Sequence, residues 1–499
     1  MRIVGNTTLL GICVTAALAL TGCGDQAKTG AVEATLFPIP CRVANVENEV
    51  RCATLDVFEN RDTRQGRKIG LHIVVLPATA RIKEPDPVFV FAGGPGQAAS
   101  QLARESLAML GGLNTRRDIV LIDQRGTGKS NGLGCKFVDP DALESIDPAV
   151  RAQEDRRRVV DCRDALAARA DLTRYTTTIA MADIEDARVA LGYEKINLWG
   201  GSYGTRAAME YLRRHPAAVR SVVLDGVAPP SMALPATFAR DAGAAYDKML
   251  DACAREAGCA KRFPQLKSDI DELLARAEKS PRKIFLPGTR TGEPREIVIS
   301  RDAVLSSMFV ALYVPQFAAM LPEVLSHAGR GNFAPLLAIG DAFGVFDEEK
   351  IFAGMRFSVV CAEDLPRIAA STAGTERAPF GGMFVREMAK ACGEWPRGAM
   401  AKDFDQPVQS DKPVLILSGA LDPVTPPIHG EEVAKSLPRS RHLIAPNIGH
   451  GVSGQGCAPR LIKKFIESAR VENIDGACLA RLPRPLFYEP MRDKKVAGK

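Results

Sequence analysis

Six short hydrophobic runs stand out along the chain, and each is followed at once by a loop containing glycine, aspartate or proline. The runs cover residues 87–91, 118–122, 195–199, 221–224, 413–417 and 441–444. Continuous apolar runs of this length are typical of strands that are buried on both faces of a parallel sheet. Since helical sequence such as 183–191 separates several of the runs, the pattern predicts an α/β fold with a mostly parallel central sheet.

The strand pattern fades in the middle of the chain. Residues 230–409 are rich in Ala, Leu, Met, Lys and Glu with helical spacing, and strand signals resume at Pro413. Near the start, 51–58 and 68–76 have the pattern of an antiparallel hairpin. We therefore predict a core in two parts, 41–229 and 410–490, an inserted and mainly helical cap, 230–409, and a tail, 491–499.

The N-terminal residues have the layout of an export signal. Arg2 precedes an apolar stretch too short to span a bilayer comfortably, and Leu20-Thr21-Gly22-Cys23 resembles a bacterial lipobox, in which the cysteine is lipidated. We predict a signal over 1–23, a linker over 24–40 and a protein of the periplasm or cell envelope. Gly24 favours anchoring to the outer membrane. An ordinary signal peptide with an accidental cysteine is the alternative.

Cysteine count and charge narrow the function classes. The net charge of +6 over 499 residues, without a long basic run, argues against nucleic acid as a partner. Beyond Cys13 and Cys23, ten of the twelve cysteines remain, and an even set in an exported chain suggests disulfides. Their order permits five local bridges: Cys41 to Cys52, Cys135 to Cys162, Cys253 to Cys259, Cys361 to Cys392 and Cys457 to Cys478. The cysteines could instead bind a metal, but no CxxC pair or histidine cluster supports such a site. We expect no metal or cofactor.

One glycine-rich segment imitates a nucleotide-binding loop. The sequence DQRGTGKS at 123–130 ends like a P-loop, but that motif requires glycine at the position of Asp123. We predict instead a buried turn that Asp123 and Arg125 hold in place.

The stretch LWGGSYGTRAA, 198–208, contains the motif G-x-S-x-G between a predicted strand and a predicted helix. This is the context of a nucleophile elbow, where small neighbours allow a strained turn that projects a serine hydroxyl above the sheet. Ser202 is therefore the predicted nucleophile. The backbone N–H of Tyr203 and that of Gly94, in the loop after an early strand, are the predicted oxyanion donors.

A serine nucleophile needs a histidine base and an acid, which in this type of fold follow in the order Ser, Asp or Glu, His. His450 lies between glycines after the last predicted strand, and we prefer it to the four other histidines that follow Ser202. Asp422, one strand earlier, is the predicted acid, and Asp225 is its rival because it also follows a strand.

The segments GGPGQ, DQRGTGKS, GGSYGTRAA, GALDPVTPP and GHG, in this order, resemble the proline-iminopeptidase-type serine peptidases. The most similar branch is that of the secreted tripeptidyl aminopeptidases with a TAP-like C-terminal region, and the resemblance spans about residue 40 to residue 485. It implies an α/β-hydrolase core with a cap and a triad of Ser202, Asp422 and His450. Ala92 replaces the histidine that precedes GGPG in proline iminopeptidases, which argues against strict proline specificity.

The resemblance also implies a way to bind a peptide's free amino terminus. Relatives use acidic cap residues, for which Glu363 and Asp364 are the candidates, while Thr425 supports the acid loop. We therefore expect a serine exopeptidase that releases short N-terminal pieces from peptides. A carboxylesterase or amidase with the same triad, acting on an ester, is the second hypothesis, and a non-catalytic binding lipoprotein is the third. The sequence does not specify the oligomeric state.

Overall fold

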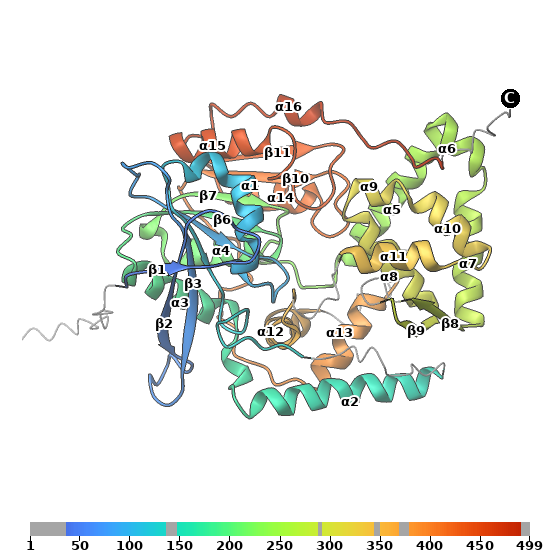
Figure 1. Cartoon of the computed structure of the whole chain (residues 1–499), viewed down its shortest axis with the longest axis horizontal. Coiled ribbons are helices and arrows are strands. Elements are labelled where there is room, and N and C mark those ends of the chain that lie inside the picture. Colours follow the sequence, from blue (N-terminus) through green and yellow to red (C-terminus); the bar gives the residue numbers. More distant parts are fainter. Residues whose placement is uncertain (1–35, 136–146, 288–291, 344–349, 369–378, 491–499) are drawn as a thin grey trace, which may run out of the picture.

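The computed structural model describes residues 36–135, 147–287, 292–343, 350–368 and 379–490 (Figure 1). The predicted signal, Cys23 and the tail lie outside these residues, as does most of the linker. Within the described parts of the chain, no helix is both long enough and apolar enough to span a bilayer.

A nine-stranded sheet in the order β1-β2-β3-β5-β4-β6-β7-β10-β11 forms the centre of the molecule. Its strands are β1 (Ile39–Cys41), β2 (Val50–Phe58), β3 (Lys68–Leu76), β4 (Val88–Phe91), β5 (Ile119–Ile122), β6 (Ile196–Gly201), β7 (Val219–Asp225), β10 (Val414–Gly419) and β11 (Ser440–Ala445). The six hydrophobic runs form the strands β4, β5, β6, β7, β10 and β11. They lie side by side in the sheet as β5-β4-β6-β7-β10-β11, and all neighbouring pairs among them are parallel. The predicted hairpin is present as β2 and β3, in register from Arg51 opposite Val75 to Phe58 opposite Lys68. The α/β class is therefore confirmed.

Helices cover both faces of the sheet, which explains why the strand sequences are continuously apolar. One face packs on α1 (Ala103–Asn114) and α15 (Ala458–Ser468), and the other on α3 (Thr177–Ala190) and α4 (Tyr203–Arg214). Successive residues of a strand point to opposite faces of the sheet. Leu198 packs in the core on the α3 and α4 side, and Trp199 packs in the core on the α1 and α15 side. The remaining core helices are α2 (Pro148–Ala167), α14 (Pro427–Ala434) and α16 (Ala477–Ala480).

The region between β7 and β10 has an apolar core of its own. Its helices are α5 (Phe238–Arg255), α6 (Ala257–Arg262), α7 (Leu266–Lys279), α8 (Arg301–Leu312), α9 (Pro315–Ala318), α10 (Leu321–Gly329), α11 (Ala334–Phe343), α12 (Ala353–Val359) and α13 (Met383–Glu394). It also contains a two-stranded antiparallel sheet of β8 (Arg282–Pro287) and β9 (Pro294–Ile299), which the sequence pattern did not predict. Helix α12 and the second half of α13 differ from the others, because Met355, Val359, Met388 and Ala391 pack into the core of the sheet.

The five local disulfides that the order of cysteines permits are all present, with Cα–Cα distances from 5.1 to 6.4 Å. Cys361 to Cys392 joins the continuation of α12 to α13.

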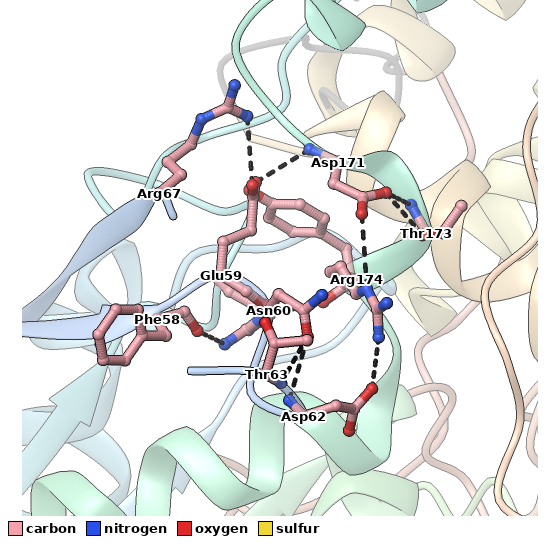
Figure 2. Close-up of polar contacts among 11 residues, drawn as sticks. Phe58, Glu59, Asn60, Asp62, Thr63, Arg67, Asp171, Thr173 and Arg174 are labelled. Carbon is pink, nitrogen blue, oxygen red and sulfur yellow. Dashed lines mark hydrogen bonds and ion pairs between the residues drawn. The ribbon is translucent and has the colours of Figure 1, made fainter. Parts of the chain in front are cut away.

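The segment that imitates a P-loop is a buried structural turn, as predicted. Asp123 accepts hydrogen bonds from the Ser100 backbone and hydroxyl. Fully buried Arg125 pairs with Asp183 at 2.6 and 2.7 Å and donates to the carbonyl of Glu59. The Glu59 carboxylate in turn accepts from Arg67 and from the backbone N–H of Asp171 (Figure 2). These contacts fasten the hairpin β2–β3 to the core.

A C-terminal strap, residues 481–490, leaves α16 and runs across to the cap (Figure 1). The backbone N–H of Tyr488 donates to the Ala319 carbonyl at 3.1 Å, and that of Phe487 donates to the Glu256 carboxylate at 3.1 Å. The ring of Phe487 is buried in the cap core. The strap therefore connects core and cap a second time, far along the chain from the inserted region.

Candidate active site

Ser202 occupies a strained turn between β6 and α4. Its φ of 56° and ψ of −126° are rare for a residue with a side chain. The turn needs small neighbours, because a Cβ on Gly200 would lie 2.4 Å from the carbonyl oxygen of Gly204, and one on Gly204 would lie 2.1 Å from that of Phe91. The Ser202 N–H donates to the carbonyl of Asp225 at 2.9 Å. The motif read from the sequence thus has the backbone geometry of a nucleophile elbow.

His450 and Asp422 form a hydrogen-bonded pair on the loops after β11 and β10. The distance from His450 Nδ1 to Asp422 Oδ2 is 2.8 Å. The fully buried Asp422 carboxylate also accepts the backbone N–H groups of Val424 and Thr425 at 2.8 Å, and the Thr425 hydroxyl at 2.7 Å. Thr425 Oγ1 lies 3.1 Å from His450 Nδ1, so this hydroxyl contacts both members of the pair.

Asp422 and His450 shift each other's pKa. Burial by itself raises the pKa of Asp422, but the charge of His450 and the hydrogen bonds from His450, Thr425 and Val424 bring that pKa below its ordinary value. Burial alone would lower the pKa of His450, and the Asp422 carboxylate outweighs it and raises that pKa. Because Nδ1 is held by Asp422, Nε2 is the nitrogen left for chemistry.

Asp225, the rival acid, serves a different purpose. Its carboxylate accepts the backbone N–H groups of Val452 and Ser453, just after His450, and its carbonyl accepts the Ser202 N–H. The next residue, Gly226, faces the imidazole: a Cβ there would lie 3.2 Å from His450 Cε1. Asp225 and Gly226 thus lie between the serine turn and the histidine loop. No hydrogen bond joins Ser202 to His450 in the described structure, and such bonds commonly tighten only when substrate is bound.

The other histidines after Ser202 all have partners away from this loop. His327 lies 3.2 Å from Glu323, His429 lies 2.9 Å from Asp241, and His442 lies 2.9 Å from the Ser418 hydroxyl. The ring of His215 lies 5.1 Å from that of Tyr211, tilted by 46°. His450 is therefore the histidine that the fold brings beside Asp422.

The loop with Gly94 lies against the nucleophile. A Cβ on Gly93 would come within 3.3 Å of Ser202 Cβ, and the Gly93 N–H is held by the Gln97 side chain at 3.2 Å. Tyr203 is the first residue of α4, so its N–H is one of the free donors at a helix N-terminus. The two predicted oxyanion donors therefore belong to segments that flank Ser202.

Tyr313 is a neighbour of the histidine that the sequence did not reveal. Its carbonyl accepts the His450 N–H at 2.9 Å, and its ring meets the imidazole edge to face, with centroids 5.1 Å apart. A Cβ on Gly449 would lie 2.3 Å from the same carbonyl, which explains the glycine before His450. Any residue can offer a carbonyl, so no sequence motif marks this contact.

Glu363 and Asp364 lie in protein contacts, with exposed fractions of 1% and 0%. Glu363 accepts from the Thr177 backbone and hydroxyl, and the Thr177 hydroxyl also lies 2.6 Å from that of Tyr203. Asp364 pairs with Arg206 at 2.8 Å. Burial, together with the charge of Asp364, raises the pKa of Glu363 to about 8. In this structure the two carboxyl groups fasten the first turn of α4, and Asp364 Oδ2 is buried without a hydrogen-bond partner in the described parts of the chain.

A cavity of about 230 Å³ opens beside His450. It is lined by 313–316 from the cap, by 447–451 from the histidine loop, by Gln455, and by Leu482, Pro483 and Pro485 from the C-terminal strap. Among the residues that the structure describes, no group of three or more His, Cys, Asp or Glu side chains could hold a metal ion.

The sequence matches the profile of the alpha/beta hydrolase fold family over residues 86–456. It is 27% identical over 454 residues to the protein named serine protease Hip1 of Mycobacterium tuberculosis, covering 84% of this chain and 85% of the relative. It is 28% identical over 200 residues to a tripeptidyl aminopeptidase of Streptomyces coelicolor, covering 38% and 37%. A crystal structure of proline iminopeptidase from Mycobacterium smegmatis covers 84% of this chain and 98% of its own, with 14% identity and a TM-score of 0.37.

Proposed function

Because the chain belongs to the alpha/beta hydrolase fold family, we propose that it is a serine exopeptidase that releases short N-terminal pieces from peptides. The observation that carries the proposal is the His450–Asp422 pair, on the loops after β11 and β10, beside the strained Ser202 turn. The similarity to a protein named a serine protease, over 84% of this chain, supports peptides as the substrate class.

The proposed reaction is acyl transfer. His450 Nε2 takes the proton of the Ser202 hydroxyl while the oxygen attacks the substrate carbonyl. The oxyanion that forms is held by the N–H groups of Gly94 and Tyr203. His450 then gives its proton to the leaving amine as the carbon–nitrogen bond breaks, and water releases the acyl group by the same steps. Asp422 fixes the orientation of the imidazole and stabilises its protonated form throughout.

A carboxylesterase or amidase with the same triad is the second candidate. It is favoured by the burial of Glu363 and Asp364, because Glu363 is held by Thr177 and Asp364 Oδ1 by Arg206. Asp364 Oδ2 has no hydrogen-bond partner among the described residues but is itself buried, so a substrate ammonium reaches it only if the surrounding protein opens. A pKa of about 8 also leaves Glu363 mostly uncharged at neutral pH. Whether turnover needs a free amino group therefore separates the two candidates.

The decisive experiment uses the chain from residue 24 onward, made in an oxidising compartment. It compares free and N-acetylated mono-, di- and tripeptide anilides with a short-chain nitrophenyl ester. We expect turnover of the free-amine peptides only, and none by Ser202→Ala, whereas the distant Ser436→Ala should match the wild type. Cleavage of the ester without cleavage of any peptide would contradict the exopeptidase and leave the triad in place. A fully active Ser202→Ala would exclude the triad itself.

We propose further that the protein acts in the cell envelope, attached through lipidated Cys23. The five disulfides support folding in an oxidising compartment. Full-length protein should partition with membranes, and Cys23→Ser should release it. Retention of the Cys23→Ser protein in the membrane fraction would exclude this anchor.

A further inference from the structure

The cavity beside His450 is assembled from three parts of the chain that are distant in sequence. Residues 313–316 connect α8 to α9 in the cap, residues 447–451 carry the histidine, and the strap contributes Leu482, Pro483 and Pro485. His450 is itself part of the wall. A molecule in this cavity therefore lies against the proposed general acid.

The position of the cavity relative to the reacting bond follows from the chemistry. The carbonyl oxygen of a substrate must point to the N–H groups of Gly94 and Tyr203, whereas the leaving nitrogen must face His450, which protonates it. Neither 93–97 nor 202–204 contributes to the cavity wall. The cavity thus lies against His450 and apart from the oxyanion donors, as a site for the leaving group would.

Apart from His450, which is paired with the Asp422 carboxylate, the wall carries no acidic or basic side chain. Apolar groups such as Val314, Pro315 and Pro483 predominate, with three side-chain amides among them, from Gln316, Asn447 and Gln455. Asn447 already donates to the Leu482 carbonyl at 2.9 Å. A carboxylate or ammonium group would lose water here and meet no opposite charge other than that of His450, which Asp422 already balances, whereas an uncharged side chain incurs no such cost.

Size and rigidity limit the occupant further. About 230 Å³ is below the range of about 300 to 1,000 Å³ for sites that enclose a whole small ligand, which suits one residue. The walls are fastened together, because the His450 N–H donates to Tyr313 and the Tyr488 N–H donates to Ala319. Three prolines, Pro315, Pro483 and Pro485, restrict the backbone of two walls. A preformed site of this kind lowers the cost of ordering the protein when it binds.

We propose that this cavity is the subsite for the first residue of the leaving peptide and that it selects an uncharged, apolar side chain. The proposal rests on the proposed acyl-transfer function. In the forward reaction the scissile carbon–nitrogen bond breaks, and the new amine takes the proton from His450. In reverse, an amine in the cavity attacks the acyl-enzyme and gives a proton to His450, and His450 passes it to Ser202 Oγ as the bond from that oxygen to the acyl carbon breaks. Added amines therefore report on the subsite directly.

The experiment measures how amines compete with water for the acyl-enzyme formed from a nitrophenyl ester or an anilide that the protein cleaves. The amines are leucinamide, glycinamide and aspartic acid α-amide, and the products are separated by chromatography. We expect leucinamide to capture the acyl group about tenfold more efficiently than glycinamide, as apolar pockets discriminate by about this much. The aspartic acid amide should be the poorest nucleophile.

Two matched substitutions in the cap test the location. Gln316→Trp fills the cavity from its wall and should reduce the preference for leucinamide over glycinamide from about tenfold to less than about twofold. Gln265→Trp, at the start of α7 and away from the cavity, should keep the wild-type preference. Equal capture of all amines, or an unchanged preference in Gln316→Trp, would overturn the subsite. Failure of Ser202 to form an acyl-enzyme with any substrate would instead overturn the proposed function, and the subsite with it.

Discussion

Asp225 accepts the backbone N–H of Val452 through both carboxylate oxygens, at 2.8 and 3.0 Å. The Ser453 N–H also donates to Asp225 Oδ2, at 2.7 Å. The two residues follow His450 almost directly, so the carboxylate fixes the loop that carries the imidazole. The aspartate that competes with Asp422 in the sequence thus positions the histidine through its backbone, while Asp422 holds the ring.

This division of labour predicts different costs for the two aspartates. Asp225→Asn places an amide N–H₂ against backbone donors and should lower kcat up to about 100-fold by displacing His450. Asp422→Asn should lower kcat about 10⁴-fold, because the imidazole loses its orienting acceptor. Near-UV circular dichroism offers a control, since Trp199 donates to Ser453 in the same loop at 2.9 Å. Equal losses of kcat would show that Asp225 is more than a positioning residue.

Substitution of Thr425 should reveal what its hydroxyl adds to the pair. Thr425→Val keeps the shape of the side chain but removes the donor 2.7 Å from Asp422, and hydrogen bonds to charged groups contribute about 1.5 to 3 kcal/mol. We expect kcat/KM to fall by about 10- to 100-fold in Thr425→Val and to stay near the wild-type value in Thr425→Ser. If Thr425→Ser is as poor as Thr425→Val, the methyl group and not the hydroxyl is what matters.

The pH dependence of activity should report on His450. The base must be neutral, and Asp422 raises its pKa above the ordinary value of about 6.5. The value of kcat/KM should therefore fall as the pH decreases through a midpoint above about 6.5, and Asp422→Asn should shift the midpoint of its residual activity downward. A profile measured from about pH 5 to pH 9 would show both effects. If the midpoint is unchanged in Asp422→Asn, the decrease in kcat/KM at low pH does not come from protonation of His450.

Glu363 should make the stability of the protein depend on pH. Its pKa is raised to about 8 in the folded protein, above its value in the unfolded chain, so the folded state binds the extra proton between the two values. The free energy of unfolding should consequently decrease as the pH rises through this window. Glu363→Gln should flatten this decrease in thermal unfolding curves, whereas Glu472→Gln, on the surface, should not. If the stability of wild type and that of Glu363→Gln depend on pH in the same way, the Glu363 carboxyl group is charged in the folded state.

The disulfide between Cys361 and Cys392 should stabilise the segment that carries Glu363. It closes a loop with a sequence separation of 31, for which chain entropy predicts about 3 to 4 kcal/mol. The double substitution to alanine should lower the free energy of unfolding by about this amount in urea titrations. A change of less than about 1 kcal/mol would indicate that the contacts of α12 with the core suffice without the bridge.

The strands were predictable because helices bury both faces of the sheet, which leaves an unbroken apolar run as a signature. The hairpin β8–β9 was not, since its strands lie on the cap with much of β8 exposed, and the sequence there alternates weakly. The strained turn at Ser202 could be read because only glycine fits beside it.

The choice between Asp225 and Asp422 could not be derived with certainty from the sequence. Both follow a buried strand, and only the three-dimensional path of the loops decides which carboxylate meets the imidazole. Glu363 illustrates a second limit. An acidic pair in a turn-like sequence indicates solvent, but the chain buries it because Thr177 and Arg206 supply matching donors from distant helices. The amino-terminus site assigned to it stays a prediction.

The C-terminal strap changes the kind of motion open to the cap. A cap joined to its core only through the ends of one insertion can swing like a lid on a hinge. Here Phe487 and Tyr488 fasten the far side of the cap to a segment that is continuous with the core, so the cap is braced instead. Swinging it open first requires these two backbone contacts to break and the Phe487 ring to leave its apolar site. Proteolytic cleavage within the strap would remove the brace while leaving every residue of the proposed triad in the chain.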